Sequence, residues 1–205
     1  MIKVDVINKS KNALPVYAKK GDSGFDLMAD FSGITKSSDI VAFNSYASWK
    51  EDSLEKITIR PGGRVIVPTN IFTAIPVGYE VQVRPRSGLA IKRGITVLNT
   101  PGTIDSGYRN GWGVILINLG IDNFDICQGD KIAQGVLVKV EEVEWNEVTE
   151  LSESERNTGG FGHTGVSTKE PDTKEETEES KNESSPNLTA DEILSEEKPS
   201  RRRHR

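Results

Sequence analysis

The 205-residue chain has very few of the side chains from which metal centres and disulfides are built. It contains one cysteine, Cys127, and two histidines. A single cysteine excludes a disulfide within the chain and favours a reducing, intracellular setting. One cysteine and two histidines are also too few for a dedicated zinc site.

Long hydrophobic runs and a strong charge of one sign are absent as well. No apolar stretch approaches the roughly 20 residues that a membrane-spanning helix needs. The residues that follow Met1, IKVD, lack the basic and apolar regions of a signal peptide. We therefore expect a cytoplasmic or other intracellular protein with no membrane partner. The formal net charge of −5 gives no indication of stable nucleic-acid binding.

Residues 166–205 contain no aromatic side chain and very little Val, Ile or Leu. Such a composition cannot bury enough apolar surface to offset chain entropy. We expect a disordered, charged tail here, whose basic end, SRRRHR, has no assigned role. About 165 residues remain, which is enough for one compact core.

Short apolar stretches separated by turn residues predict an all-β fold. Residues 79–84 and 2–6 alternate apolar with polar side chains, as half-buried strands do. Shorter apolar runs occur at 65–67, 114–117 and 136–140. Gly, Pro, Asn and Asp separate these runs, which is typical of a sandwich, barrel or jelly roll.

Three segments depart from this pattern. Ser87–Arg93 is predicted as a short helix that Ser87 can cap and Gly94 can end. Pro61-Gly62-Gly63 is predicted as a break between strands. Residues 30–56 are rich in Ser and Asp but carry four aromatic residues, so we interpret them as an extended loop or insertion. Packing on the body, packing on a neighbouring subunit and a role as a substrate lid all remain open.

The segment NTPGTIDSGYR, residues 99–109, places an acid, an aromatic ring and an amide on one short turn. Asp105 lies between Gly102 and Gly107, and glycine lets backbone approach a ligand closely. Taken alone, the segment is either an ordinary hairpin with a solvated acid or part of a ligand site.

Four further segments accompany this turn: GDSGFDLMA (21–29), PRSGLA (85–90), GDKIAQG (129–135) and RNTGGFGHTG (156–165). In order and spacing, the five segments resemble those of the homotrimeric, all-β dUTP diphosphatases (dUTPases) of bacteria and phages. The resemblance covers residues 13–165. It implies a jelly-roll or distorted β-barrel core at 1–155 and a glycine-rich arm at 156–165 that closes the active site.

The resemblance also implies a reaction. Water attacks the α-phosphorus of dUTP and gives dUMP and diphosphate, which lowers dUTP and supplies dUMP for thymidylate synthesis. The expected cofactor is Mg²⁺, held through substrate phosphates and waters with no direct protein ligand. Each site of the expected homotrimer combines residues from several subunits.

Residue roles carry over onto the matching positions. Asp105 matches the acid that activates water, Asn99 the reader of the uracil edge, and Tyr108 the ring that packs against deoxyribose and excludes a 2′-hydroxyl. Three neighbouring residues add backbone contacts to the base: Gly102, Thr103 and Ile104. Four residues match the phosphate contacts: Arg86, Ser87, Gly88 and Gln134. Asp26 matches an acid that supports the site near the metal waters, although a purely structural turn carboxylate is an open alternative.

In the arm, Phe161 matches the ring that stacks on uracil, and Arg156 matches the arginine that meets the γ-phosphate. Further phosphate contacts match Gly162, His163 and Thr164. The chain departs from the family pattern at Asn110, Lys131, Gly135, Asn157 and His163. Asn110 replaces a glycine, and we expect it to keep the turn through a left-handed conformation.

Two other functions remain in competition. A dCTP deaminase on the related fold would need a glutamate in the nucleoside pocket, and residues 95–108 contain none. A non-enzymatic regulatory or binding protein could use the 30–56 excursion and the charged tail as interaction surfaces.

Overall fold

The computed structural model describes residues 1–154 and residue 157. Within this range the chain forms eleven β-strands, one α-helix and one short 3-10 helix, which confirms the all-β prediction. The chain divides into two units, Met1–Glu147 and Val148–Arg205. All described helices and strands lie in the first unit. The tail at 166–205 and most of the arm at 156–165 lie outside the described residues.

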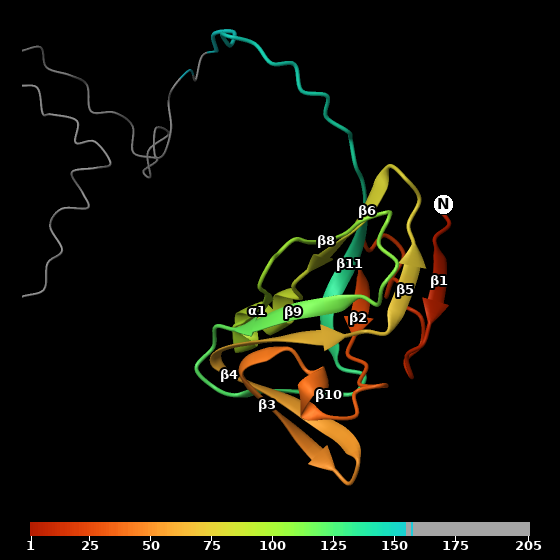
Figure 1. Cartoon of the computed structure of the whole chain (residues 1–205), viewed down its shortest axis with the longest axis vertical. Helices are drawn as coiled ribbons and strands as arrows, with labels where there is room; N and C mark the ends of the chain where they lie inside the picture. Colours follow the sequence, from red (N-terminus) through yellow and green to blue (C-terminus); the bar gives the residue numbers. More distant parts are fainter. Residues whose placement is uncertain (155–156, 158–205) are drawn as a thin grey trace, which may run out of the picture. The chain divides into compact units, whose positions relative to one another are not determined.

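Three antiparallel sheets build the first unit (Figure 1). A two-stranded sheet pairs β1 (Asp5–Asn8) with β5 (Ile71–Ala74). The second sheet contains β10 (Phe124–Cys127), β4 (Ser53–Pro68), β9 (Gly113–Asn118) and β7 (Ile95–Val97), and β3 (Ala42–Lys50) also pairs with β4. The third runs in the order β2 (Phe25–Met28), β11 (Lys131–Lys139), β6 (Tyr79–Arg84) and β8 (Gly102–Ile104). These sheets fit the expected jelly roll.

The core follows from alternation along the strands. Val81 and Val83 of β6 are buried, as are Val114 and Leu116 of β9, while the residues between them are partly exposed. Burial of these apolar side chains supplies the main driving force for folding. The N-terminal strand differs from its prediction, because β1 starts at Asp5 and all four of its residues are exposed.

The prediction of a long loop at 30–56 is wrong for its second half. After the 3-10 helix η1 (Ser37–Asp39), β3 runs from Ala42 to Lys50 and forms a hairpin with the start of β4. Figure 1 shows this hairpin projecting from the other strands. Three of the four aromatics of the segment lie on β3, and two of them face arginines across the hairpin: Phe43 with Arg64, and Tyr46 with Arg60.

The predicted break at Pro61-Gly62-Gly63 is also wrong, because β4 continues through it to Pro68. The chain absorbs the irregularity locally. Gly62 has a φ of +73°, and the pairing of β3 with β4 shifts register between Phe43 and Ser45. A side chain at Gly63 would collide with the backbone carbonyl of Asn44, so glycine lets the two strands stay close.

The helix α1 spans Ser87–Arg93, as predicted, and Gly94 ends it in the left-handed conformation with φ +67°. The capping prediction is wrong by one residue, since Arg86 is the N-cap and its side chain makes no capping hydrogen bond. Among the described residues, no helix is long and apolar enough to cross a membrane.

Candidate active site

A polar pocket of about 280 Å³ lies where the third sheet meets the start of α1. Its lining residues are Asp26, Arg86, Ser87, Gly88, Leu89, Lys92 and Gln134. Strand pairing explains this meeting, because Asp26 of β2 pairs with Gln134 of β11, and Gln134 pairs with Arg84 at the end of β6. The chain then passes through Pro85 into α1. Three segments that are distant in sequence therefore converge through register alone.

Two cations hold the carboxylate of Asp26. Arg86 Nε lies 3.0 Å from Oδ1, and Lys131 Nζ lies 2.8 Å from Oδ2. Arg86 Nη1 also donates a hydrogen bond to the carbonyl oxygen of Lys131, at 3.1 Å. These contacts tie β2, β11 and the start of α1 together. Arg86 thus links β2 and β11 to the start of α1, in addition to lining the pocket.

Gln134 is fixed by its amide. Its Nε2 donates to the carbonyl oxygen of Pro85 at 3.0 Å, and the second hydrogen of that NH₂ group is left for a ligand. Gly24 makes room for this side chain, because a Cβ on Gly24 would lie 2.5 Å from Gln134 Oε1. At Gly88 the situation is different, since a Cβ there would meet nothing within 4 Å. That open space belongs to the pocket.

The second group of predicted site residues lies on the turn after β7. The Asn99 side chain packs over Gly102, where an added Cβ would lie 3.2 Å from Asn99 Nδ2. Pairing of β8 with β6 fixes the backbone of three predicted residues: Gly102 opposite Val83, Thr103 opposite Gln82, and Ile104 opposite Val81. A cis peptide bond joins Thr100 and Pro101. The amide and its backbone neighbours therefore form one surface.

Asp105 follows β8 directly and is exposed. The backbone turns back at this point, because Tyr108 N–H donates to the Asp105 carbonyl oxygen at 3.1 Å. Tyr108 is partly exposed and its hydroxyl donates to the Gly111 carbonyl oxygen at 3.2 Å. Arg109 Nη1 donates to the carbonyl oxygens of Ser106 and Tyr108. The carboxylate thus projects from a turn that its neighbours hold in shape.

The structure places the predicted residues in two separate groups. The pocket beside α1 contains Arg86, Ser87, Gly88, Gln134 and Asp26, while its lining includes none of Asn99, Asp105 and Tyr108. The arm residues Arg156, Phe161, Gly162, His163 and Thr164 lie outside the described residues. Asn157, which is described, has a φ of +44°, a conformation that favours glycine and that Asn tolerates.

Sequence reasoning missed two lysines of this site. In the sequence Lys131 is only a departure from the family pattern, and the structure places its ammonium on Asp26. The five motifs assign no role to Lys92, and it lines the pocket. A signal for Lys92 existed, because residues four apart on a helix share a face and Lys92 follows Gly88 by four.

A buried carboxylate lies just beyond the end of β2, the strand that carries Asp26. Asp30 lies two residues after β2 and is fully buried. Its oxygens accept hydrogen bonds from Lys11 N, Ser32 N, Asn70 Nδ2 and Gln128 Nε2, at 2.7–3.0 Å. Burial raises the pKa of Asp30, but these donors outweigh burial and the pKa is lowered. The network anchors the end of the strand that carries Asp26.

No direct metal centre is evident in residues 1–154 and 157. Among them, no three His, Cys, Asp or Glu side chains are grouped to hold a metal ion. The one carboxylate of the pocket, Asp26, already has a cation on each oxygen. That a Mg²⁺ ion is held through ligand phosphates and waters stays a prediction.

The fold and the site define an all-β protein with a polar pocket lined by two basic side chains and an exposed acid on a glycine-rich turn. A model of the dUTPase family matches residues 52–165. The deoxyuridine 5′-triphosphate nucleotidohydrolase of Finegoldia magna is 44% identical over 164 residues, which are 80% of this chain and 99% of that protein. The protein of the same name from Desulfotalea psychrophila is 47% identical over 154 residues, 75% of this chain and 88% of its own length.

Solved structures agree with the sequence relatives. A single-residue mutant of the Staphylococcus bacteriophage 80alpha dUTPase, bound to dUpNHpp, matches with a TM-score of 0.63 at 24% identity. The match covers 81% of this chain and all of the phage protein, and it supports the fold. The chain belongs to the dUTPase family.

Proposed function

We propose that the protein hydrolyses dUTP to dUMP and diphosphate, as a dUTP diphosphatase. The observation that carries this proposal is the family match over residues 52–165 together with 43–47% identity to curated dUTP nucleotidohydrolases over most of the chain. The geometry supports it, because the pocket at α1 suits a polyphosphate and the turn at 99–109 presents an amide and an acid.

In this mechanism, Asp105 orients and deprotonates the water that attacks the α-phosphorus. Ser87, Gly88 and Gln134 donate hydrogen bonds to phosphate oxygens, where negative charge grows during the attack. Arg86 holds the turn through Asp26 and presents the rest of its guanidinium to the pocket. A Mg²⁺ ion on the phosphates would neutralise part of their charge.

The turn at residues 99–109 selects the base and the sugar of the substrate. Asn99 offers both a donor and an acceptor to the uracil edge. The backbone of Gly102, Thr103 and Ile104 adds further contacts to the base. A base with the opposite donor pattern would leave the Asn99 amide and these backbone groups unpaired. Tyr108 packs against deoxyribose. In the arm, Phe161 covers the base, and Arg156, Gly162, His163 and Thr164 bind the phosphates once the arm closes.

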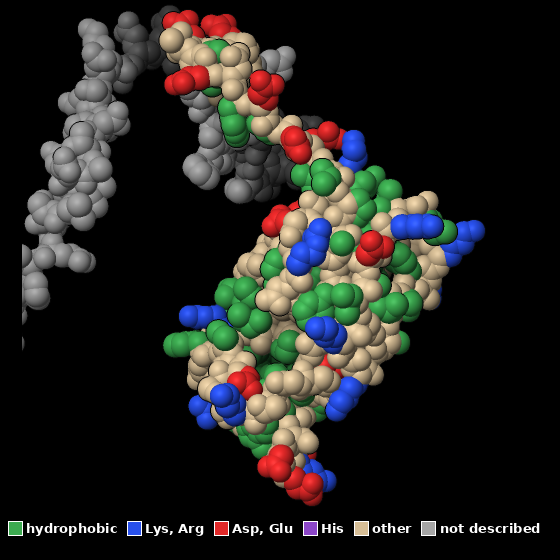
Figure 2. Space-filling model, turned by 45° about the vertical axis from the view of Figure 1, so that its right-hand side comes forward, with side chains coloured by type: hydrophobic (Ala, Val, Ile, Leu, Met, Phe, Trp, Pro, Cys, Tyr) green, Lys and Arg blue, Asp and Glu red, His purple; other side chains and the backbone are tan. Residues whose placement is uncertain are grey.

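We also propose that the active form is a homotrimer in which different subunits contribute the two groups of site residues. Their separation within one chain supports this arrangement. Exposed hydrophobic side chains on the first unit support it too, among them Val77, Ile91, Leu119 and Ile121. Figure 2 shows hydrophobic side chains at several places on the visible face. Static light scattering tests the assembly, and a monomer that is fully active would contradict it.

Diphosphate release tests the function. The wild-type protein should release diphosphate from dUTP in preference to dCTP, dTTP and UTP, and Mg²⁺ should stimulate the reaction. Asp105→Asn should lower kcat by about 100-fold or more, while a non-hydrolysable dUTP analogue still binds. Asp122→Asn, at an exposed acid in another turn, is the matched control. Wild-type turnover by Asp105→Asn would refute the mechanism, and uracil nucleotides formed from dCTP would indicate a deaminase.

A further inference from the structure

Lys92 occupies a position in the pocket for which the mechanism above has no use. It lies in the last turn of α1, and it lines the pocket together with Ser87, Gly88 and Gln134. Gly88 and Lys92 are four residues apart, so they share one face of the helix. A Cβ on Gly88 would meet no atom within 4 Å, so the space beside Gly88 is open. Lys92 borders this space.

The charge of Lys92 is not neutralised by the pocket's own acid. Asp26 is engaged by Arg86 and Lys131. The ion pairs among residues 1–154 and 157 do not include Lys92; they are Lys56–Asp125, Arg86–Asp26, Lys131–Asp26 and Lys139–Glu141. The pocket therefore presents a net positive charge, because its one acid already faces two cations and Lys92 makes no ion pair with any described residue.

We infer that Lys92 is a further substrate-binding residue, whose ammonium binds the triphosphate and follows the charge that develops on the diphosphate leaving group. The inference rests on the proposed function. A lysine is a compact charge on a long flexible stem, with three donors that can follow phosphate oxygens as they move. A cation that meets more negative charge in the transition state than in the substrate complex raises kcat as well as affinity.

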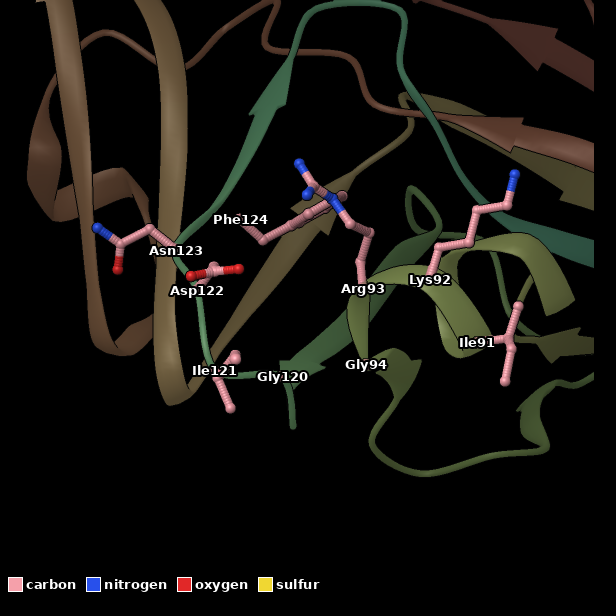
Figure 3. A pocket seen from close by; sticks show the side chains of 9 residues that line it. All are labelled: Ile91, Lys92, Arg93, Gly94, Gly120, Ile121, Asp122, Asn123 and Phe124. Carbon is pink, nitrogen blue, oxygen red and sulfur yellow. The ribbon is translucent and has the colours of Figure 1, made fainter.

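The next residue on the same helix provides the control. Arg93 has the same charge, and it lines a second pocket with Gly94, Asp122 and Phe124. Lys92 borders that second pocket too, but of the two residues only Lys92 lines the pocket beside Ser87 and Gln134. Figure 3 shows the Arg93 side chain extending toward Phe124 while Lys92 leaves the helix in another direction. Arg93→Gln removes one positive charge from the same helix without removing a group from the phosphate pocket.

Steady-state hydrolysis of dUTP compares Lys92→Gln, Lys92→Arg and Arg93→Gln. A charge-assisted hydrogen bond is worth about 1.5–3 kcal/mol, which corresponds to a loss of about 10- to 150-fold in kcat/KM for Lys92→Gln. Lys92→Arg should keep most of the activity, and Arg93→Gln should stay within about twofold of the wild type. Equal effects of Lys92→Gln and Arg93→Gln would overturn the inference.

Inhibition by inorganic diphosphate gives a readout that a structural role would not move. The inhibition constant should rise about tenfold or more in Lys92→Gln and should not change in Arg93→Gln. Reduced activity with unchanged diphosphate inhibition and a lowered Tm would assign Lys92 to stability and overturn the inference. If the wild type does not hydrolyse dUTP, the proposed function fails by itself. Calorimetric titration of the wild type and of Lys92→Gln with inorganic triphosphate then still decides whether Lys92 binds phosphate.

Discussion

Replacing Asp30 by asparagine tests whether the buried hydrogen-bond network at the end of β2 stabilises the fold. Each oxygen of Asp30 accepts two hydrogen bonds: Oδ1 from Ser32 N and Asn70 Nδ2, and Oδ2 from Lys11 N and Gln128 Nε2. Asparagine has the same shape but puts an NH₂ group where one oxygen was. The two N–H groups that donated to that oxygen then face another N–H donor inside the protein.

The magnitude follows from the two donors that are left without an acceptor. An unsatisfied buried donor costs about 1–3 kcal/mol, so Asp30→Asn should lower the free energy of unfolding by about 2–6 kcal/mol at pH 7. Urea unfolding at equal protein concentration measures this loss. The control is Asp5→Asn, at an exposed acid of β1, which should change stability by no more than about 0.5 kcal/mol.

The pH dependence gives a second check on the same residue. The pKa of Asp30 is lowered in the folded state from its ordinary value of 3.8. Its contribution to stability is therefore complete above that value and is lost as the pH falls through the lower, folded-state pKa. The gap between wild type and Asp30→Asn should accordingly narrow in acid. A loss below about 0.5 kcal/mol at neutral pH, or a gap that widens in acid, would refute this account of the network.

Two glycine substitutions separate a functional close contact from a structural one. Gly24→Ala places a Cβ 2.5 Å from Gln134 Oε1, so the glutamine must move; kcat/KM for dUTP should fall about tenfold with little change in urea unfolding, and unchanged kinetics would contradict the role of Gln134. Gly94→Ala combines a φ of +67° with a Cβ 2.5 Å from Gly120 N, so stability should fall by at least about 2 kcal/mol. Gly21→Ala, with φ +97° and no neighbour within 4 Å, should lose about half of that in the same urea assay; equal losses would mean that the clash has no effect.

Much of the fold could be predicted because its signals are local. The alternation of residues 79–84 and the stop at Gly94 act within a few residues, and both elements appear where they were expected. The hairpin of β3 could not be predicted in the same way. Its sequence mixes three aromatics with Asn, Ser and Ala and becomes a strand through pairing with β4, and cross-strand pairing depends on context more than on propensity.

The candidate site shows the same division. Short motifs carry Asp105, Asn99 and Gln134, so their roles could be predicted from the sequence and stay predictions. Their contacts were not predictable. Nothing in the sequence indicates that Arg86 would engage Asp26 and the carbonyl of Lys131. Such contacts depend on the register of β2 against β11, which is set by the fold as a whole.

At three positions where the chain departs from the family pattern, a neighbouring side chain or a different hydrogen bond takes over the contact of the usual residue. Gly135 stands where a bulky apolar residue is usual, and the ring of its cross-strand partner Phe25 occupies the space that a side chain at 135 would take. Asn110 does not adopt the left-handed conformation that we expected; its Oδ1 accepts a hydrogen bond from Gly111 N instead, at 2.8 Å. Lys131 replaces an arginine and still reaches Asp26. In each case a neighbouring contact compensates the change, so these substitutions leave the positions of Asp26, Gln134 and Tyr108 supported, and the pocket beside α1 keeps its positive charge.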